Sequence, residues 1–549
     1  MNEYDNYFLP LADRAEQEEL FKKLIDACFN FYSGETRDGK VLNYRPPEVL
    51  KEIAAEDLPI DGTELREAIS TLEEQVGKYS VAQFDDTYLA FPDSGNAIPA
   101  IWADIYSKFI NQNLIAVSRS APIATFIEIQ LLEWLRQIIG YEYKSLRDIH
   151  SLSEVSGMVT TGGHMSNHVA IMAALNKTFP EIKKGGLSCL TVQPAVILAG
   201  AISHYSFSSA LHHLGIGQDA LLDARSSNDY TTNLEDVERL LTNPPEGKQP
   251  FMVVGVAGNS RTTSLDDLSG LSALCKKYNV WFHTDACHGG ALLFSSEYRK
   301  LLARIEESDS VSIDPHKGLF APYPLSFVLF KERDTLTKFT RYESEVRDGS
   351  SWDLGYITPF YGSRGFESLK LWLTIKTLGM RQIEQIIDDR QEIAHRLSKY
   401  IASSKFFTIL NDMTFYRMVF LYYPEDVKQK LDVMELTVPQ KVAIKRLIDQ
   451  YTHAINEELY VTGSLCLDEF KLDDLGNRTK LDSSEKFVVM SVTVGNPKQS
   501  TEKINVALQK LFTLCEARVS EFEQAVNEAL KDDNINEHKP GALYGPAGW

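Results

Sequence analysis

Between about residue 100 and residue 375, short apolar segments alternate with amphipathic stretches of helical spacing. The apolar segments are residues 195–199, 251–256, 280–284, 310–313 and 325–330. Helical periodicity separates them, as in residues 233–241 and 265–278. This alternation predicts an α/β fold with a mostly parallel sheet flanked by helices. Ligands bind such sheets beyond the carboxyl ends of the strands, so we expect chemistry in the loops that follow these segments.

The chain is expected to divide around this region. Residues 1–99 have helical spacing with Pro- and Gly-containing connectors and predict an N-terminal helical segment, while residues 100–378 form the large domain. Residues 379–535 include an expected strand at 487–494 and a helix at 500–517, which predicts a small α+β C-terminal domain. Residues 536–549 are rich in Gly and Pro and are expected to be a flexible tail.

Charge and composition exclude several classes of protein. The 549 residues include 56 Lys+Arg and 76 Asp+Glu, and the resulting charge of −20 repels nucleic acids and anionic membrane surfaces. Apolar runs such as residues 251–257 are far shorter than the about 20 residues of a membrane-spanning helix. The acidic start lacks the layout of a signal peptide, and six scattered cysteines show no C-x-x-C pair. We therefore expect a cytoplasmic protein that binds neither nucleic acid nor membrane.

The segment DPHKG (314–318) follows the strand expected at 310–313, which places Lys317 just past a strand end. An ordinary lysine is protonated at neutral pH and is a poor nucleophile. Burial or a neighbouring cation that lowers its pKa prepares it for imine formation. His316 is a candidate for that neighbour or for a phosphate ligand. Taken alone, the segment is better explained as a solvated loop.

The segment HTDACHGG (283–290) ends another expected strand. A carboxylate such as Asp285 is costly there unless it meets a cation or hydrogen-bond donors. Its two glycines let the backbone approach a ligand closely. Period-two alternation also places His283, Asp285 and Cys287 on one side, which makes a zinc site an alternative without a second cluster to support it.

The segment TTGGHMSN (160–167) opens an expected helix with two glycines, and the free N–H groups of a helix start suit a phosphate. His164 and His168 are four residues apart, but the Glu of the H-E-x-x-H metalloprotease motif is absent, so that metal site is rejected. SHYS (203–206) and the polar loop 258–268 follow two further strands. Taken alone, they are a structural histidine and the capped start of a helix.

Together the five segments follow the order phosphate cradle, histidine, polar loop, aspartate and lysine. In this order the chain resembles the group II, fold-type I amino-acid decarboxylases that use pyridoxal phosphate, over roughly residues 80–500. DPHK, HTDACHGG and SHYS carry the resemblance, and GGHMSN with FPEIKKGG is most similar to the glutamate and cysteine-sulfinate branch. SRGFESLKLWL (363–373) is similar to the family's helix into the small domain. The resemblance implies decarboxylation of an L-amino acid to an amine and carbon dioxide.

The resemblance implies a role for each matching residue. Lys317 would bind the cofactor covalently, and Asp285 would keep the ring nitrogen protonated so that the ring accepts electrons. His204 would stack on one face of the ring, with Cys287 at the other face. The residues expected around the phosphate are Gly163, His164 and His316, and those near the ring hydroxyl and Asp285 are Asn259, Ser260 and Thr262.

The resemblance also implies a homodimer with its active site at the subunit interface and a tyrosine on a mobile loop as proton donor. Within residues 341–364 we expect Tyr356 to be this donor, although an alternative alignment places Trp352 at the catalytic position. Glu128 is expected to be structural, and Arg364 is expected to hold the two domains together.

The substrate is not predicted. The glutamate branch binds its substrate's carboxylate with an arginine on the C-terminal strand, whereas Ser491 stands at about that position here, so glutamate is not assigned. A carbon–carbon lyase or an aldehyde-forming decarboxylase or oxidase on the same cofactor is the alternative enzyme. A zinc-binding or non-catalytic interaction protein is the alternative outside enzymes.

Overall fold

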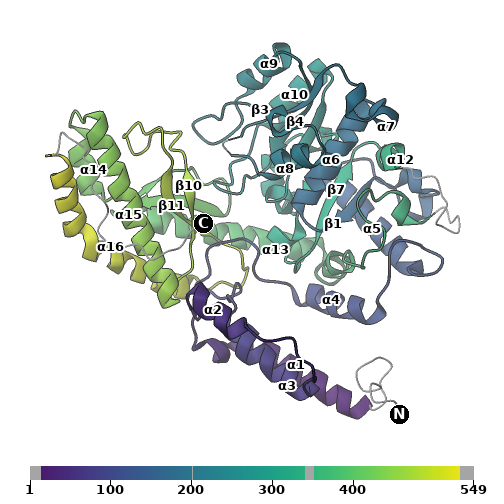
Figure 1. Ribbon diagram of the computed structural model, residues 1–549, viewed down its shortest axis with the longest axis horizontal. Helices are drawn as coiled ribbons and strands as arrows, with labels where there is room; N and C mark the ends of the chain where they lie inside the picture. Colours follow the sequence, from purple (N-terminus) through teal and green to yellow (C-terminus); the bar gives the residue numbers. More distant parts are fainter. Residues whose placement is uncertain (1–13, 201, 341–351, 532–549) are drawn as a thin grey trace.

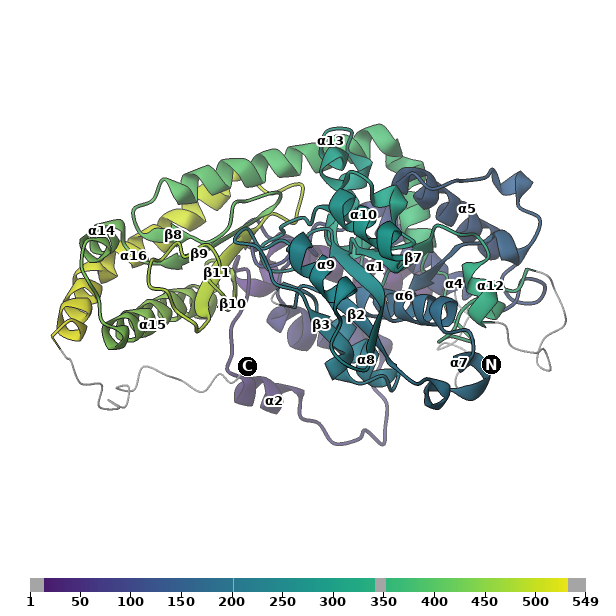
Figure 2. The same ribbon diagram turned by 90° about the horizontal axis from the view of Figure 1, so that it is seen from above.

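The structure is a computed structural model that describes residues 14–200, 202–340 and 352–531. Two sheets lie side by side with helices packed around them, and an arm of N-terminal helices extends from the body (Figures 1 and 2). The predicted tail at 536–549 and the first part of the predicted loop, residues 341–351, lie outside the described residues.

The larger sheet has seven strands in the order β1-β7-β6-β5-β4-β2-β3. They are β1 (Gly157–Thr160), β2 (Gln193–Leu198), β3 (Leu221–Asp223), β4 (Lys248–Val256), β5 (Trp281–Asp285), β6 (Ser310–Ile313) and β7 (Ser326–Phe330). Strands β3, β2, β4, β5 and β6 are parallel, and β7 runs antiparallel to both of its neighbours. The predicted α/β class with a mostly parallel sheet is confirmed. The short strands β1 and β3 were not predicted.

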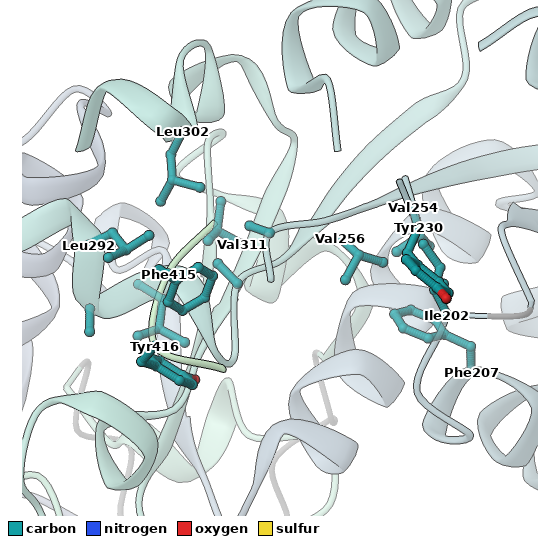
Figure 3. Packing of buried hydrophobic residues seen from close by; sticks show 14 of the residues in the cluster. Ile202, Phe207, Tyr230, Val254, Val256, Leu292, Leu302, Val311, Phe415 and Tyr416 are labelled. Atoms are coloured by element: carbon teal, nitrogen blue, oxygen red, sulfur yellow. The ribbon is translucent and has the colours of Figure 1, made fainter. Parts of the chain in front are cut away.

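Helices flank the larger sheet. They are α5 (Pro122–Ile139), α6 (Gly163–Thr178), α7 (Ile182–Gly185), α8 (Ser206–His213), α9 (Leu234–Thr242), α10 (Leu268–Tyr278), α11 (Pro315–Gly318) and α12 (Thr335–Thr340). The capped helix start expected in the polar loop 258–268 is formed by Asp267, whose carboxylate accepts the Gly270 N–H at 3.0 Å, and not by Ser264 or Asp266, the two residues that the loop also offers as caps. Buried valines such as Val254, Val256 and Val311 form the core between these layers (Figure 3).

The second sheet is antiparallel throughout, in the order β10-β11-β9-β8. Its strands are β8 (Phe407–Ile409), β9 (Arg417–Tyr422), β10 (Asp468–Leu472) and β11 (Phe487–Thr493), and its helices are α14 (Glu425–Asp432), α15 (Val438–Thr462) and α16 (Thr501–Ala529). The long helix α13 (Leu369–Ala402) runs from the larger sheet toward the smaller one and is kinked at Gly379, whose φ is 68° (Figure 2). Phe415 and Tyr416, which precede β9, belong to the same buried cluster as Val311 (Figure 3).

The N-terminal helices are α1 (Arg14–Ser33), α2 (Pro47–Ala54), α3 (Leu65–Thr71) and α4 (Ile98–Ile110). Helices α1 and α3 form the arm at the lower edge of Figure 1, whereas α4 packs against α13. Within the described residues, none of the helices combines the length and the apolar character that a membrane crossing requires.

Candidate active site

A cavity of about 320 Å³ lies where β1, β2, β4, β5 and β6 end. Small-molecule sites in proteins typically have volumes of about 300–1,000 Å³. Nine predicted residues line this cavity: Gly163, His164, His204, Asn259, Ser260, Asp285, Cys287, His316 and Lys317. The structure therefore brings together side chains from five separate segments at the sheet edge where ligands were expected.

Lys317 lies in the short helix α11, and its side chain is 18% exposed. Its Nζ is 3.0 Å from Oδ2 of Asp314, the residue that precedes this helix. Burial by itself lowers the pKa of Lys317, but the carboxylate of Asp314 and the more distant Asp93 and Asp285 raise it above the usual value. Acids rather than cations therefore dominate the surroundings of this amine.

Asp285 is buried at the end of β5 and faces the cavity with its carboxylate bonded on both oxygens. Asn167 Nδ2 donates to Oδ2 at 3.0 Å, and the backbone N–H of Cys287 donates to Oδ1 at 3.1 Å. Burial raises the pKa of Asp285, but the bond from Cys287 and the nearby His283, His204 and Lys317 lower it below its ordinary value. The carboxylate is thus anionic at neutral pH and able to hold a proton on a bound heterocycle.

His283 supports the Asp285 carboxylate through Asn167. Its Nδ1 lies 2.8 Å from Ser310 Oγ, and its Nε2 lies 3.2 Å from Asn167 Oδ1, which also accepts the Ser312 hydroxyl at 2.9 Å. Asn167 therefore connects His283 to Asp285. Sequence reasoning missed Asn167, although it stands one turn after Gly163 on α6 and could have been placed on the same helix face.

The free energy of unfolding should depend on His283 at acidic pH. Burial lowers the pKa of His283 to about 4. An unfolded histidine has a pKa of about 6.5, so the unfolded state binds the extra proton first and the folded state loses stability as the pH falls from about 6.5 to 4. We expect this residue to remove about 3 kcal/mol of unfolding free energy across that window.

Urea unfolding at pH 7 and pH 4.5 measures this effect. His283→Gln should lose most of this pH dependence, whereas His150→Gln, at an exposed position, should keep it. Equal pH dependence in the wild type and His283→Gln would contradict the assignment.

The close approach of three segments explains why residue 163 is a glycine. A Cβ at Gly163 would collide with Cys287 Sγ and would lie 2.8 Å from Asp314 Oδ2. Gly163 begins the 16-residue helix α6, and Thr161 to His164 line the cavity at the start of this helix. The positive end of a helix dipole can hold an anion, so this wall is suited to a phosphate.

His204 and His316 line other parts of the cavity. Burial lowers the pKa of His204, so its ring is neutral at pH 7 and available for stacking. His316 Nδ1 lies 2.8 Å from the Leu325 carbonyl oxygen, and its ring packs on Tyr323 with the centroids 4.2 Å apart. The ring of His316 is thereby fixed at the base of the lysine helix.

Two predicted residues do not line the cavity. Thr262 is buried behind Asn259, whose Nδ2 donates to the threonine Oγ1 at 2.8 Å, so Thr262 positions a residue of the cavity wall. Tyr356 is partly buried in the segment before α13, and its carbonyl accepts the Thr340 hydroxyl at 3.0 Å. Trp352, the alternative, packs edge-on against Phe126 with the centroids 5.4 Å apart.

Further cavity residues that were given no role from the sequence include Asp314, Tyr323, His288 and Thr161. His288 Nδ1 is 2.7 Å from the Tyr416 hydroxyl, so the segment before β9 reaches the cavity wall. Thr161 Oγ1 lies 3.0 Å from the hydroxyl of Tyr361, which belongs to the predicted loop. Both tyrosines come from distant segments, and nothing in the local sequence indicates their partners.

Glu128 and Arg364 are joined by a two-point ion pair. Arg364 Nη1 donates to Glu128 Oε2 at 2.9 Å, its Nη2 donates to the other carboxylate oxygen, and Ser368 also donates to the carboxylate. The pair connects α5 to the segment that enters α13. Both side chains lie outside the cavity lining. Both also lie within residues 100–378, so this pair does not itself join the large domain to the small one.

Ser491 is buried on β11 and does not line the cavity. Arg417, on the adjacent strand β9, lies near the cavity wall, because its Nη1 donates to the carbonyl of Ser260, which lines the cavity, at 2.7 Å. Its other donors bond Thr493, Asp468 and the Ala90 carbonyl. Each of the three guanidinium nitrogens of Arg417 therefore makes a structural bond.

The zinc alternative at His283, Asp285 and Cys287 has no geometric support. Among residues 14–200, 202–340 and 352–531, these three do not form a group of ligand atoms close enough to share an ion. The His283 nitrogens instead contact Ser310 and Asn167. All six cysteines are free, as the sequence predicted.

The cavity fits a pyridine ring with a phosphate. The anionic Asp285, the amine of Lys317 and the glycine-opened start of α6 all face it. Asp314 Oδ1 is buried without a hydrogen-bond partner among the described residues, which leaves an acceptor for a bound polar group.

A family model for the pyridoxal-dependent decarboxylase conserved domain matches residues 47–423. The chain belongs to this family. The predicted pyridoxal-phosphate-dependent decarboxylase, with its enzyme class and cofactor, is thereby confirmed. Aspartate 1-decarboxylase of Aliivibrio fischeri is 27% identical to this decarboxylase over 437 residues, which are 77% of this chain and 78% of that protein.

Further comparisons agree with this family. Cysteine sulfinic acid decarboxylase of Mus musculus is 26% identical over 429 residues, which are 77% of this chain and 83% of that protein. The crystal structure of mouse CSAD in its apo form matches this decarboxylase with a TM-score of 0.80 at 23% identity, covering 91% of this chain and 99% of that one. That structure shares the fold of this decarboxylase.

Proposed function

We propose that the cavity removes carbon dioxide from an L-amino acid to leave the corresponding amine. The observation that carries this proposal is that Lys317 and Asp285 face one cavity together with the start of α6. When bound, pyridoxal phosphate supplies an electron-accepting ring for the electrons left by departing carbon dioxide.

The residues of the chain prepare that chemistry. Lys317 acts as a nucleophile only after it loses a proton, and Asp314 Oδ2, 3.0 Å from its Nζ, holds the amine in place. Asp285 would hold a proton at the ring nitrogen, His204 would pack on the ring, and Cys287 would limit the space at its other face. The backbone N–H groups of Gly163 and His164, with His316 nearby, would hold the phosphate, and Asn259 and Ser260 would lie near the ring hydroxyl.

A panel of amino acids scored by carbon dioxide release tests the reaction. We expect one amino acid to give stoichiometric amine and carbon dioxide. Aldehyde with ammonia would indicate the oxidative alternative, and a cleaved carbon chain would indicate the lyase. No product from any amino acid by the cofactor-loaded protein would contradict decarboxylation.

We propose that the substrate carries no second carboxylate. No arginine lines the cavity among the described residues, and Asp93 and Asp314 make the end of the cavity near Lys317 negative. Neutral or cationic amino acids should therefore react faster than glutamate and aspartate in the same panel. A preference for an acidic amino acid would contradict this assignment without contradicting decarboxylation.

We propose Tyr356 as the proton donor that completes the reaction, and Tyr361 is its matched comparison from the same loop. Tyr356→Phe should shift the products toward aldehyde and lower the yield of amine by about 10²–10⁴-fold, because protonation by a positioned acid contributes that much. Tyr361→Phe should change only the hydrogen bond to Thr161. Chromatography of amine and aldehyde measures the ratio, and an effect confined to Tyr361→Phe would transfer the role to that residue.

We propose that the enzyme is a homodimer with its active site at the subunit interface. Helix α4 supports this because it is apolar on two faces. Ala100 and Ala103 are buried, whereas Trp102 is 64% exposed and Tyr106 is 61% exposed. A helix with two apolar faces can bury the second one only against another partner, and an exposed apolar face of this kind is typical of an interface.

Trp102→Glu should therefore produce a monomer with much reduced activity, because a buried charge opposes association. Val433, which is 86% exposed beyond α14, provides the control. Val433→Glu should remain dimeric in sedimentation-velocity measurements. A Trp102→Glu protein that sediments as the wild type does would exclude this face from the interface.

We propose a cytoplasmic location. Six free cysteines support it, because a reducing compartment keeps thiols unpaired.

A further inference from the structure

Three histidines gather beside the cavity: His164 and His168 on α6 and His213 at the end of α8. Their ligand nitrogens all lie within 4.8 Å of one another. Among the described residues, no other group of three or more His, Cys, Asp or Glu side chains meets this condition. His164 and His168 lack the glutamate of the metalloprotease motif, but the fold adds a third imidazole, that of His213, beside them.

We propose that His164, His168 and His213 bind a divalent transition metal of the zinc class, which joins the first turns of α6 to the end of α8. Imidazole nitrogens are preferred ligands of such ions.

The geometry at His168 supports this site. Its Nδ1 lies 2.9 Å from the His164 carbonyl oxygen, so Nδ1 carries the proton and Nε2 presents its lone pair. A carbonyl that fixes the tautomer in this way is the usual second partner of a metal-binding histidine. His168 Nε2 is 3.2 Å from His213 Nδ1. Two nitrogens bound to one tetrahedral zinc ion at about 2.0–2.1 Å lie about 3.3 Å apart, which is nearly the same separation.

The surroundings also suit a metal. His168 is 5% exposed, and the ring of Phe360 lies edge-on to it with the centroids 6.4 Å apart. His213 is exposed and His164 is half-buried, so small ring rotations can bring both nitrogens to the ion.

The same 3.2 Å separation also suits a simple hydrogen bond from His213 Nδ1–H to His168 Nε2. The two alternatives differ in their response to zinc. A hydrogen-bonded pair gives no specific ion affinity, whereas a three-imidazole site binds one ion per chain.

The experiment uses untagged, cofactor-loaded protein titrated with Zn²⁺ by calorimetry, and with Co²⁺ by visible absorption. His213 is the residue to change, because it is exposed and does not line the cavity. Its neighbour His212 is also exposed and lies outside the group of three, so it is the matched control.

We expect one Zn²⁺ per chain, an affinity at least about 100-fold weaker in His213→Ala, and no change in His212→Ala. Co²⁺ should give a tetrahedral absorption band that His213→Ala abolishes. Equal Zn²⁺ affinity in His213→Ala and His212→Ala, or fewer than one Zn²⁺ per chain, would overturn the proposal. If the protein binds zinc but releases no carbon dioxide from any amino acid, the metal site stands and the proposed decarboxylation fails.

Discussion

Lys317→Ala should abolish turnover while leaving the protein folded. Loss of a residue that forms a covalent bond to its reactant costs on the order of 10⁴–10⁶-fold in kcat. The change removes the amine that faces Asp285 across the cavity, and it also leaves Asp314 without the cation 3.0 Å from its carboxylate. We therefore expect some loss of stability as well, because a buried carboxylate without a partner is costly.

A second substitution separates these two effects. Lys317→Arg keeps a positive charge beside Asp314, but a guanidinium remains protonated at neutral pH and cannot act as the nucleophile. It should be as inactive as Lys317→Ala and closer to the wild type in thermal unfolding. Lys331→Ala, at an exposed site after β7, should be fully active.

Borohydride reduction followed by peptide mapping provides a direct measurement. The wild type should carry the reduced cofactor on the peptide that contains Lys317, and both variants should carry none. Turnover by Lys317→Arg within tenfold of the wild type would show that another amine performs this role.

Asp285→Asn should keep the cofactor but react about 10²–10³-fold more slowly, the usual cost of removing one electrostatic stabiliser in a water-excluded site. The carboxylate is anionic because a hydrogen bond at Cys287 and the nearby histidines and Lys317 lower its pKa. A neutral amide cannot hold the proton on the ring nitrogen, so the ring accepts electrons less readily.

The substitution also disturbs a bonded network. Asn167 Nδ2 donates to Asp285 Oδ2 at 3.0 Å, and an amide nitrogen at that position would oppose a second donor. We expect about 1–3 kcal/mol of lost stability, measured by urea unfolding.

Asp309→Asn is the matched control for this change. Asp309 stands at the opposite end of the same strands, where it accepts the Phe282 N–H at 2.8 Å. The Asp309→Asn protein should be less stable than the wild type but should keep a kcat close to that of the wild type. If both variants lose the same activity, the effect at Asp285 is structural and its assigned role is wrong.

Local patterns predicted most of the larger sheet. The strands at 251–256, 280–284 and 310–313 were placed within three residues of β4, β5 and β6, because apolar runs between amphipathic helices have few alternative structures. Strand β3 was missed because three residues are too few to show a pattern. Helix α16 extends to Ala529 because its amphipathic spacing continues beyond the predicted end.

The candidate site followed from the same logic. Each motif was found at a strand end, and parallel strands bring their carboxyl ends to one edge. Asn167, His288 and Tyr361 were not predicted, because their roles depend on contacts across more than 100 residues of chain or on a loop that returns to Thr161.

The sequence by itself determined the layered α/β architecture, the order of the five motifs and the pairing of an amine with a carboxylate, because strand periodicity and motif chemistry are local. Only the tertiary structure decided that acids raise the pKa of Lys317, that Arg417 is already bonded, and that a third histidine joins His164 and His168. These properties arise from side chains that are distant along the chain and become neighbours only when the sheet and its helices pack.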